Sequence, residues 1–163
     1  MNFNFNPEHT FFTSDTHFNH ANIIRFCNCP FKDVEQMNET LIANWNRVVG
    51  MDDTVFHLGD FCLGGAAEWT KVLDRLNGKI YLIMGNHDLK NLRQGFINRF
   101  EHVAMQMHIR WANSESIYAT TLSSALKADT GRYGNSSDMC IPERTIQASM
   151  QSDYSTSTLR SMT

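Results

Sequence analysis

The stretch KIYLIMGNHD, residues 79–88, decides the fold of this chain. Its first part, Lys79–Met84, is an almost continuous apolar run, which is typical of a β-strand covered on both faces. The run stops at a polar cluster, Gly85-Asn86-His87-Asp88. A buried strand that ends in such a cluster favours a parallel sheet, in which ligands bind beyond the carboxyl ends of the strands.

Two earlier segments have the same form. His9–Ser14 (HTFFTS) and Thr54–Leu58 (TVFHL) are rich in β-forming residues and predict strands. Polar residues follow each of them: Asp15, Thr16 and His17 after the first, and Gly59 and Asp60 after the second. Because the carboxyl ends of parallel strands lie side by side, we expect the three polar clusters to converge in space.

Helical patterns separate these strands. Residues 34–48 carry an apolar stripe that follows the predicted N-cap Asp33 and ends before Gly50; it comprises Val34, Met37, Leu41, Trp45 and Val48. Ala66–Leu76 predicts a second helix that buries Trp69, Val72, Leu73 and Leu76, and Leu89–Phe100 predicts a third. The order βαβαβα predicts an α/β domain with a mainly parallel sheet and right-handed crossovers.

The pattern changes after residue 102. Val103–Trp111 alternates strictly between apolar and polar residues, which predicts one half-exposed strand with Val103, Met105, Met107, Ile109 and Trp111 on one face. Ser116–Thr120 (SIYAT) is the predicted hairpin partner of this strand.

The composition of the chain limits the classes of function and ligand that we expect. A chain of 163 residues with 42% hydrophobic residues predicts one folded domain. The 14 basic residues are scattered among 17 acidic ones, so we expect no long nucleic-acid surface, while a small phosphate ligand stays open. The chain has no leader-like or membrane-spanning run and no CxxC pair among its four cysteines, which predicts a cytoplasmic protein with reduced thiols. The oligomeric state stays open.

Three motifs carry a resemblance to a known family. The segments SDTHFNH (14–20), HLGDF (57–61) and MGNHD (84–88) resemble the first three motifs of the calcineurin-like metallophosphoesterases, D-x-H, G-D and G-N-H-D. The resemblance covers about residues 9–111 and is closest in form to short, single-domain bacterial and phage-type members. It implies an αββα sandwich, of which the N-terminal half is present here.

The resemblance also implies a site with two divalent metal ions. Asp15 and His17 would bind the first ion, Asp60 would bridge both ions, and Asn86 would bind the second. This mixed set of oxygen and nitrogen ligands suits Mn²⁺, which we expect, with Fe, Zn²⁺ or Ni²⁺ as alternatives.

The implied reaction is hydrolysis of a small phosphoester or a nucleotide. A metal-bridging hydroxide would attack phosphorus in line with the leaving group. His87 would reach the phosphate or the leaving group, and Asp88 would orient its imidazole. Two further histidines are open: His20 is a loop residue or a contact to substrate, and His57 is predicted to be buried and hydrogen-bonded.

The later motifs of the family are missing. These motifs are a His at the end of a further strand and a G-H-x-H turn, whereas this chain has no His after His108. We therefore expect a weakened second metal position and impaired hydrolysis. The alternative is a catalytically silent remnant that binds a single metal or a phosphate-bearing ligand.

The C-terminal segment differs in composition from the rest. Residues 119–163 contain sixteen Ser and Thr among 45 residues and no Phe, Trp or His. We therefore divide the chain into a partial metallophosphoesterase-like α/β domain, residues 1–118, and a Ser/Thr-rich tail, residues 119–163. The tail is predicted to be disordered. It is either the product of a reading-frame shift near Tyr118–Thr120 or a diverged or appended segment.

Overall fold

The computed structural model describes residues 6–89, 99–109 and 117–120. In these residues the main sheet is parallel and has the order β1 (Thr10–Thr13), β2 (Thr54–His57), β3 (Lys79–Ile83) and β4 (His102–Ala104). The helical elements are η1 (Pro7–His9), α1 (Ala21–Phe26), α2 (Val34–Val48) and α3 (Ala66–Leu73). Two further strands, β5 (Gln106–Ile109) and β6 (Ile117–Thr120), form an antiparallel pair.

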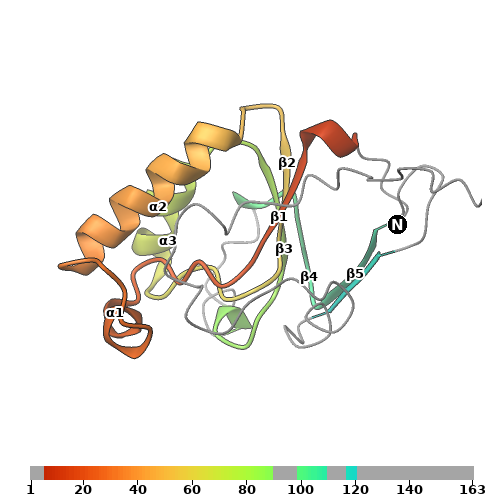
Figure 1. Ribbon diagram of the computed structural model, residues 1–163. Coiled ribbons are helices and arrows are strands. Elements are labelled where there is room, and N and C mark those ends of the chain that lie inside the picture. The colour runs from red at the N-terminus through yellow and green to blue at the C-terminus, as the bar shows by residue number, and fades with distance from the viewer. Residues whose placement is uncertain (1–5, 90–98, 110–116, 121–163) are drawn as a thin grey trace, which may run out of the picture.

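The strand order places the helices. Because β1, β2 and β3 are neighbours in chain order and right-handed crossovers join them, the connecting helices must lie on the same face of the sheet. Figure 1 shows α2 and α3 together on one face, and β5 on the other. The predicted α/β class is confirmed, with three layers in the described part of the chain: helices, parallel sheet and antiparallel pair.

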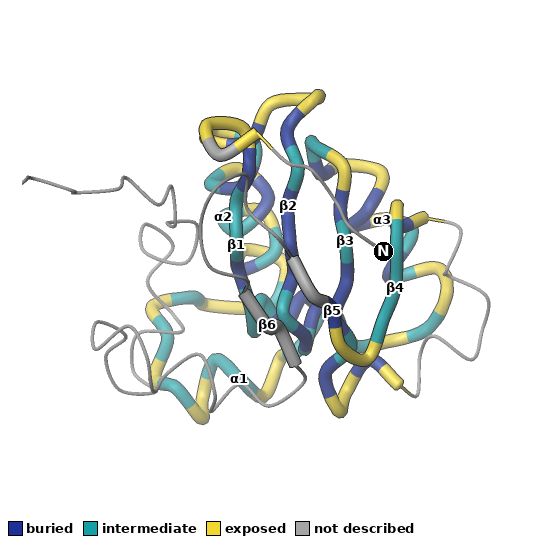
Figure 2. The backbone as a smooth tube through the Cα atoms, turned by 90° about the vertical axis from the view of Figure 1, so that its right-hand side faces the viewer, coloured by how far each residue is buried: buried dark blue, intermediate teal, exposed yellow. Residues whose placement is uncertain are grey.

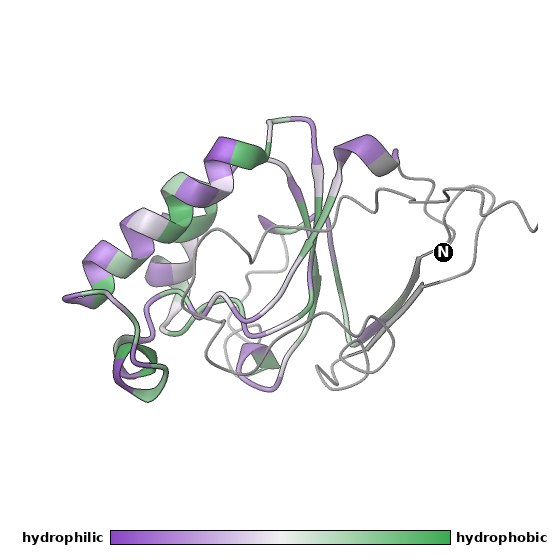
Figure 3. Cartoon of the chain, viewed as in Figure 1, coloured by the Kyte–Doolittle hydropathy of each residue, from purple (hydrophilic) through white to green (hydrophobic). Residues whose placement is uncertain are grey.

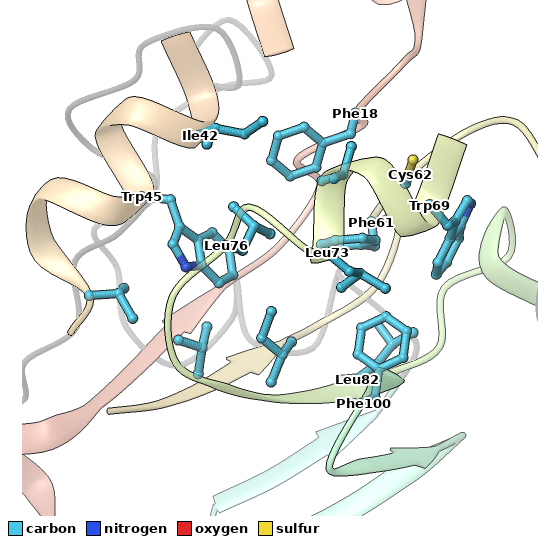
Figure 4. Packing of buried hydrophobic residues seen from close by; sticks show 14 residues of the cluster. Phe18, Ile42, Trp45, Phe61, Cys62, Trp69, Leu73, Leu76, Leu82 and Phe100 are labelled. Atoms are coloured by element: carbon cyan, nitrogen blue, oxygen red, sulfur yellow. The ribbon is translucent and has the colours of Figure 1, made fainter. Parts of the chain in front are cut away.

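Alternation along the strands supplies two separate apolar faces. Val55 of β2 and Leu82 of β3 point to the helices, where they pack with Trp45 and Trp69 in the larger core (Figure 4). The intervening residues pack on the opposite face in a smaller cluster of buried residues, which comprises Phe56, Ile83 and Met107. Figure 3 shows the hydrophobic side of α2 turned toward the sheet. Both faces of the central strands are therefore covered, as the apolar run of residues 79–84 predicts.

Helix α2 begins directly after its predicted N-cap residue, Asp33. The Asp33 carboxylate accepts a hydrogen bond of 2.8 Å from the backbone N–H of Gln36, as predicted. Trp45 is 1% exposed, and its indole N–H donates to the carbonyl oxygen of Asn77 over 2.9 Å. Val48, predicted to face the core, is instead 41% exposed, because Val49 beyond the helix end takes the buried position.

The predicted single strand over Val103–Trp111 is wrong, since the chain changes sheet within it. Val103 of β4 packs on the helix side, whereas Met107 of β5 packs in the smaller cluster on the other side. Met105, between the two strands, is 60% exposed. An alternating pattern cannot reveal such a crossing, because each half alternates correctly within its own sheet. The predicted hairpin partner is confirmed: β6 pairs with β5.

Several expectations lie outside the described residues. These are the helix over most of Leu89–Phe100, the tail after residue 120, and the outer helical layer of the αββα sandwich. Among the described residues, no helix is long and apolar enough to cross a bilayer. Cys62 is buried and Cys27 is half-buried, whereas Cys29 is disulfide-bonded, so the expectation that every thiol is reduced is wrong at Cys29.

We predict that Trp45→Ala lowers the free energy of unfolding by about 3–5 kcal/mol, because it opens a cavity in the larger core and removes an indole hydrogen bond. Val48→Ala, on the same helix, is the matched control and should change stability by less than about 0.5 kcal/mol. Urea denaturation followed by far-UV circular dichroism measures both values. Similar losses in the two variants would contradict the assigned faces of α2.

Candidate metal centre

Three predicted ligands meet at the carboxyl end of the parallel sheet. Asp15 and His17 follow β1, and Asp60 follows β2. Each residue offers one ligand atom, and these atoms all lie within 4.8 Å of one another. Two ligands on opposite sides of one ion at about 2.1 Å would be about 4.2 Å apart. Small side-chain movements therefore suffice to close the three around a divalent ion.

Backbone hydrogen bonds hold the two loops together beyond the strands. Asp15 N–H donates to the carbonyl oxygen of Gly59 over 2.9 Å, and His17 N–H donates to that of Asp60 over 3.0 Å. A further bond of 3.0 Å runs from Phe18 N–H to the Phe61 carbonyl. Figure 2 shows this end of the sheet, where buried and half-buried backbone continues past the strands. The parallel pairing of β1 and β2 thus continues into the site and sets the separation of the ligands.

All three residues have left-handed backbone conformations. The φ angles are +53° at Asp15, +47° at His17 and +56° at Asp60. Non-glycine residues seldom adopt such angles, and aspartate tolerates them better than histidine does. These angles produce tight turns that direct the side chains into the site. The backbone hydrogen bonds between the two loops maintain these conformations.

His17 is in the state that binds a metal. Its side chain is buried, and burial lowers the pKa of His17 below its usual 6.5; Asp15 and Asp60 raise this pKa in part, and His20 and His87 lower it. The ring is therefore neutral at pH 7, which is the form with a free lone pair. Its Nε2 lies 3.9 Å from Asp15 Oδ1, so this is the nitrogen that faces the other two ligands. Within the described residues, the buried Nδ1 has no hydrogen-bond partner.

Two glycines allow the loops after β2 and β3 to approach each other. A Cβ on Gly59, which has a φ of +101°, would lie 2.8 Å from the Cα of Gly85. A Cβ on Gly85 would lie 2.6 Å from the backbone nitrogen of Asp60 and would clash with its Oδ1. A side chain at Gly85 would therefore displace the Asp60 carboxylate, and one at Gly59 would push the two loops apart.

Asp88 joins these same loops from inside the protein. Its side chain is buried, and its carboxylate accepts hydrogen bonds from the backbone N–H groups of Asp60 (2.8 Å), Phe61 (3.0 Å) and Gly85 (2.8 Å). Burial raises the pKa of Asp88, and the three backbone hydrogen bonds oppose this rise. The predicted role of Asp88, orienting the His87 imidazole, stays a prediction. The structure shows a further role for Asp88, because its hydrogen bonds position the backbone that carries Asp60.

Asn86 and His87 lie exposed in the turn between Gly85 and Asp88. The backbone N–H of His87 donates to Asp60 Oδ1 over 3.1 Å, which fixes the orientation of that carboxylate. The His87 ring centre lies 6.0 Å from that of His17. The predicted cluster after β3 thus reaches the triad, while metal binding by Asn86 and catalysis by His87 stay predictions.

Two other histidines support the site from nearby. His57 is fully buried, as predicted, and its Nε2 lies 2.9 Å from Thr16 Oγ1, which also donates to the Phe61 carbonyl. Burial lowers the pKa of His57 to about 3, so its ring is neutral. His20 caps α1, whereas the sequence predicts a loop around this residue. The only sequence signal for this helix was the apolar pair Ile23 and Ile24 after a polar residue.

Comparison with known proteins places this arrangement in a family. The family model for calcineurin-like phosphoesterases matches residues 9–147. The chain belongs to the calcineurin-like phosphoesterase family. Members of this family use divalent metals, which agrees with the triad of Asp15, His17 and Asp60. The match extends past residue 118, and the proposed boundary between domain and tail stays a prediction.

Relatives of this chain come from archaea, phages and bacteria. The Uncharacterized protein MJ1445 of Methanocaldococcus jannaschii is 57% identical over 77 residues, which are 46% of this chain and 44% of that protein. The Gene 66 protein of Mycobacterium phage L5 is 36% identical over 112 residues, covering 62% of this chain and 54% of that protein. The phosphoesterase chain therefore spans about half the length of these two relatives.

A solved structure agrees with the fold. The crystal structure of AQ665 from Aquifex aeolicus, a protein of unknown function, matches with a TM-score of 0.56 at 29% identity. The match covers 67% of the phosphoesterase chain and 57% of AQ665.

We predict that Gly85→Ala weakens Mn²⁺ binding by about tenfold or more, because the added methyl group displaces the Asp60 carboxylate. Gly50→Ala is the control, since its Cβ would meet only the Asp53 side chain, at 3.3 Å. Isothermal titration with Mn²⁺ gives both affinities. Unchanged binding by the Gly85 variant would show that Asp60 is not a ligand in the position described.

Proposed function

We propose that this protein hydrolyses a small phosphoester or a nucleotide in the cytoplasm with the help of divalent metal ions, and that the metal is Mn²⁺. The observation that carries the proposal is the convergence of Asp15, His17 and Asp60 at the carboxyl end of the sheet, in a chain of this family. The site is small and lies at the surface of one domain. In the described part of the chain, the pocket beside the triad is lined by neither Lys nor Arg, so it gives no support for a long nucleic acid as the ligand.

The ligand assignments rest on the family motifs, and the grouping of Asp15, His17 and Asp60 supports the first metal position. Asp15, His17 and Asp60 would hold the first ion, and Asp60 with Asn86 would hold the second. When bound, the ions supply an activated water for attack on phosphorus and neutralise charge on the phosphate oxygens. The chain itself fixes the Asp60 carboxylate, through the backbone N–H of His87, and keeps the His17 ring neutral through burial.

His87 is the proposed catalytic group outside the metal ligands. Its ring belongs to an exposed residue beside the triad, where it can contact a substrate that enters from solvent. An imidazole there can donate a hydrogen bond to a phosphate oxygen or a proton to the leaving group. Asp88 contributes by holding the backbone on which Asp60 and Gly85 lie.

A specific observation favours a second candidate function. The family pattern adds three imidazole ligands after the G-N-H-D motif, and this chain has no His after His108. The second ion would then rest on a shared carboxylate and a neutral amide, which compete poorly with water. The alternative is therefore a protein that binds one metal or a phosphate-bearing ligand without turnover.

We predict slow, Mn²⁺-dependent hydrolysis of bis(p-nitrophenyl) phosphate by the full chain. EDTA should abolish the activity, and added Mn²⁺ should restore it, because the ions supply the nucleophile. Release of p-nitrophenolate measures turnover, with a phosphomonoester assayed in parallel. Metal binding without metal-dependent turnover on either ester would favour the silent remnant.

The proposed roles also predict different effects of two substitutions. Asp60→Asn should cause the largest single loss of Mn²⁺ affinity, because it removes the anionic group expected to touch both ions. His87→Ala should leave the Mn²⁺ affinity nearly unchanged and lower turnover by about 10²-fold or more. Titration calorimetry and the ester assay separate the two effects. Equal loss of metal in both variants would contradict the assignment.

A further inference from the structure

Three histidine rings cluster around the metal triad, and the proposed function uses only two of them. The ring centre of His20 lies 5.5 Å from that of His17 and 6.4 Å from that of His87, while those of His17 and His87 are 6.0 Å apart. His17 and His20 come from the loop after β1, whereas His87 comes from the loop after β3. His20 is half-buried and has no role in the family motifs.

The N-cap of α1 determines which nitrogen of His20 is available. The backbone N–H of Ile23 donates to His20 Nδ1 over 3.2 Å, so Nδ1 is an acceptor and carries no proton. With Nδ1 as the acceptor, the ring proton lies on Nε2. Nε2 is therefore a hydrogen-bond donor, and the cap also holds the ring in place.

The same bond argues against His20 as a metal ligand. A histidine that binds a metal through Nε2 carries its proton on Nδ1 and usually donates it to a neighbour. In His20 the neighbour is itself a donor, the N–H of Ile23, so metal binding through Nε2 would break the cap. The geometry therefore favours His20 Nε2 as a hydrogen-bond donor to a molecule bound at the metal, and not as a ligand of the metal itself.

A phosphate bound at this site would require hydrogen-bond donors for its oxygens. The groups that act electrostatically on His17 are two carboxylates and two imidazoles, Asp15, Asp60, His20 and His87. The pocket beside the triad is lined by Asp15, Thr16, His17, Ile23, Cys29, Phe31, Met37 and Leu41, with neither Lys nor Arg among them. Among the described residues around the triad, the imidazoles of His20 and His87 are side chains whose N–H groups could donate to phosphate oxygens.

We propose that His20 is a second substrate-binding residue, which donates a hydrogen bond from Nε2 to a phosphate oxygen beside His87. The proposal rests on the proposed function, because the phosphate must first be held at the metal centre. Phe26, 76% exposed with its ring centre 6.4 Å from that of His20, borders the outer side of this subsite. Figure 1 shows α1, which carries Phe26, below the start of α2 and at the same end of the structure as the carboxyl ends of the strands.

The test uses a substitution that keeps the cap and removes the donor. Asparagine is a strong N-cap residue, so His20→Asn should preserve α1, but its amide is too short to replace Nε2. With saturating Mn²⁺, we expect the dissociation constant for inorganic phosphate to rise about tenfold in His20→Asn. The Mn²⁺ affinity and the melting temperature should stay within error of the unchanged protein. Asn22→Ala, an exposed substitution on α1, is the control and should bind phosphate normally.

Each outcome decides the proposal. Unchanged phosphate affinity in His20→Asn, or no phosphate binding by the unchanged protein in Mn²⁺, would overturn it. A loss of Mn²⁺ affinity in His20→Asn would overturn it as well and would make His20 a metal ligand. Because phosphate binding is measured without turnover, the proposal can stand when ester hydrolysis fails, and it can fail when hydrolysis is observed.

Discussion

The site depends on one buried carboxylate. Asp88 has no exposed surface, and it accepts three backbone hydrogen bonds that join the loop after β2 to the loop after β3. A buried charge is tolerated only where donors surround it, and here the donors belong to the residues that carry the ligands. The close contact of Gly59 with Gly85 follows from this link, since the loops could not meet around larger residues. The positions of Asp60 and His87 are thus set by the main chain that Asp88 holds.

Much of this arrangement could be predicted from the sequence, because strand ends in a parallel sheet carry strong signals. The apolar run of residues 79–84 and its polar end predicted both β3 and the location of the site. The motifs then predicted which residues meet there, and Asp15, His17 and Asp60 do so. Composition and periodicity predict the order of strands and helices. When the strands are parallel, this order already determines that their carboxyl ends converge at one edge of the sheet.

Other features could not be predicted, for physical reasons specific to each. The change of sheet at Met105 leaves the alternation of apolar residues intact, so only tertiary packing reveals it. The exposure of Val48 reflects how the last turn of α2 meets Val49 rather than the period of the helix. His20 looked like a loop residue because a six-residue helix is too short for a periodic signal, and its cap involves an imidazole instead of a usual capping side chain.

The left-handed residues of the metal centre carry a cost for folding. At Asp15, His17 and Asp60 the backbone is held in conformations that cost about 1–3 kcal/mol each in an L-residue, and aspartate lies at the lower end of this range. Glycine at any of these positions would relieve that strain while deleting a ligand. Stability would therefore favour glycine at these three positions, whereas metal binding requires the ligand side chains that now occupy them.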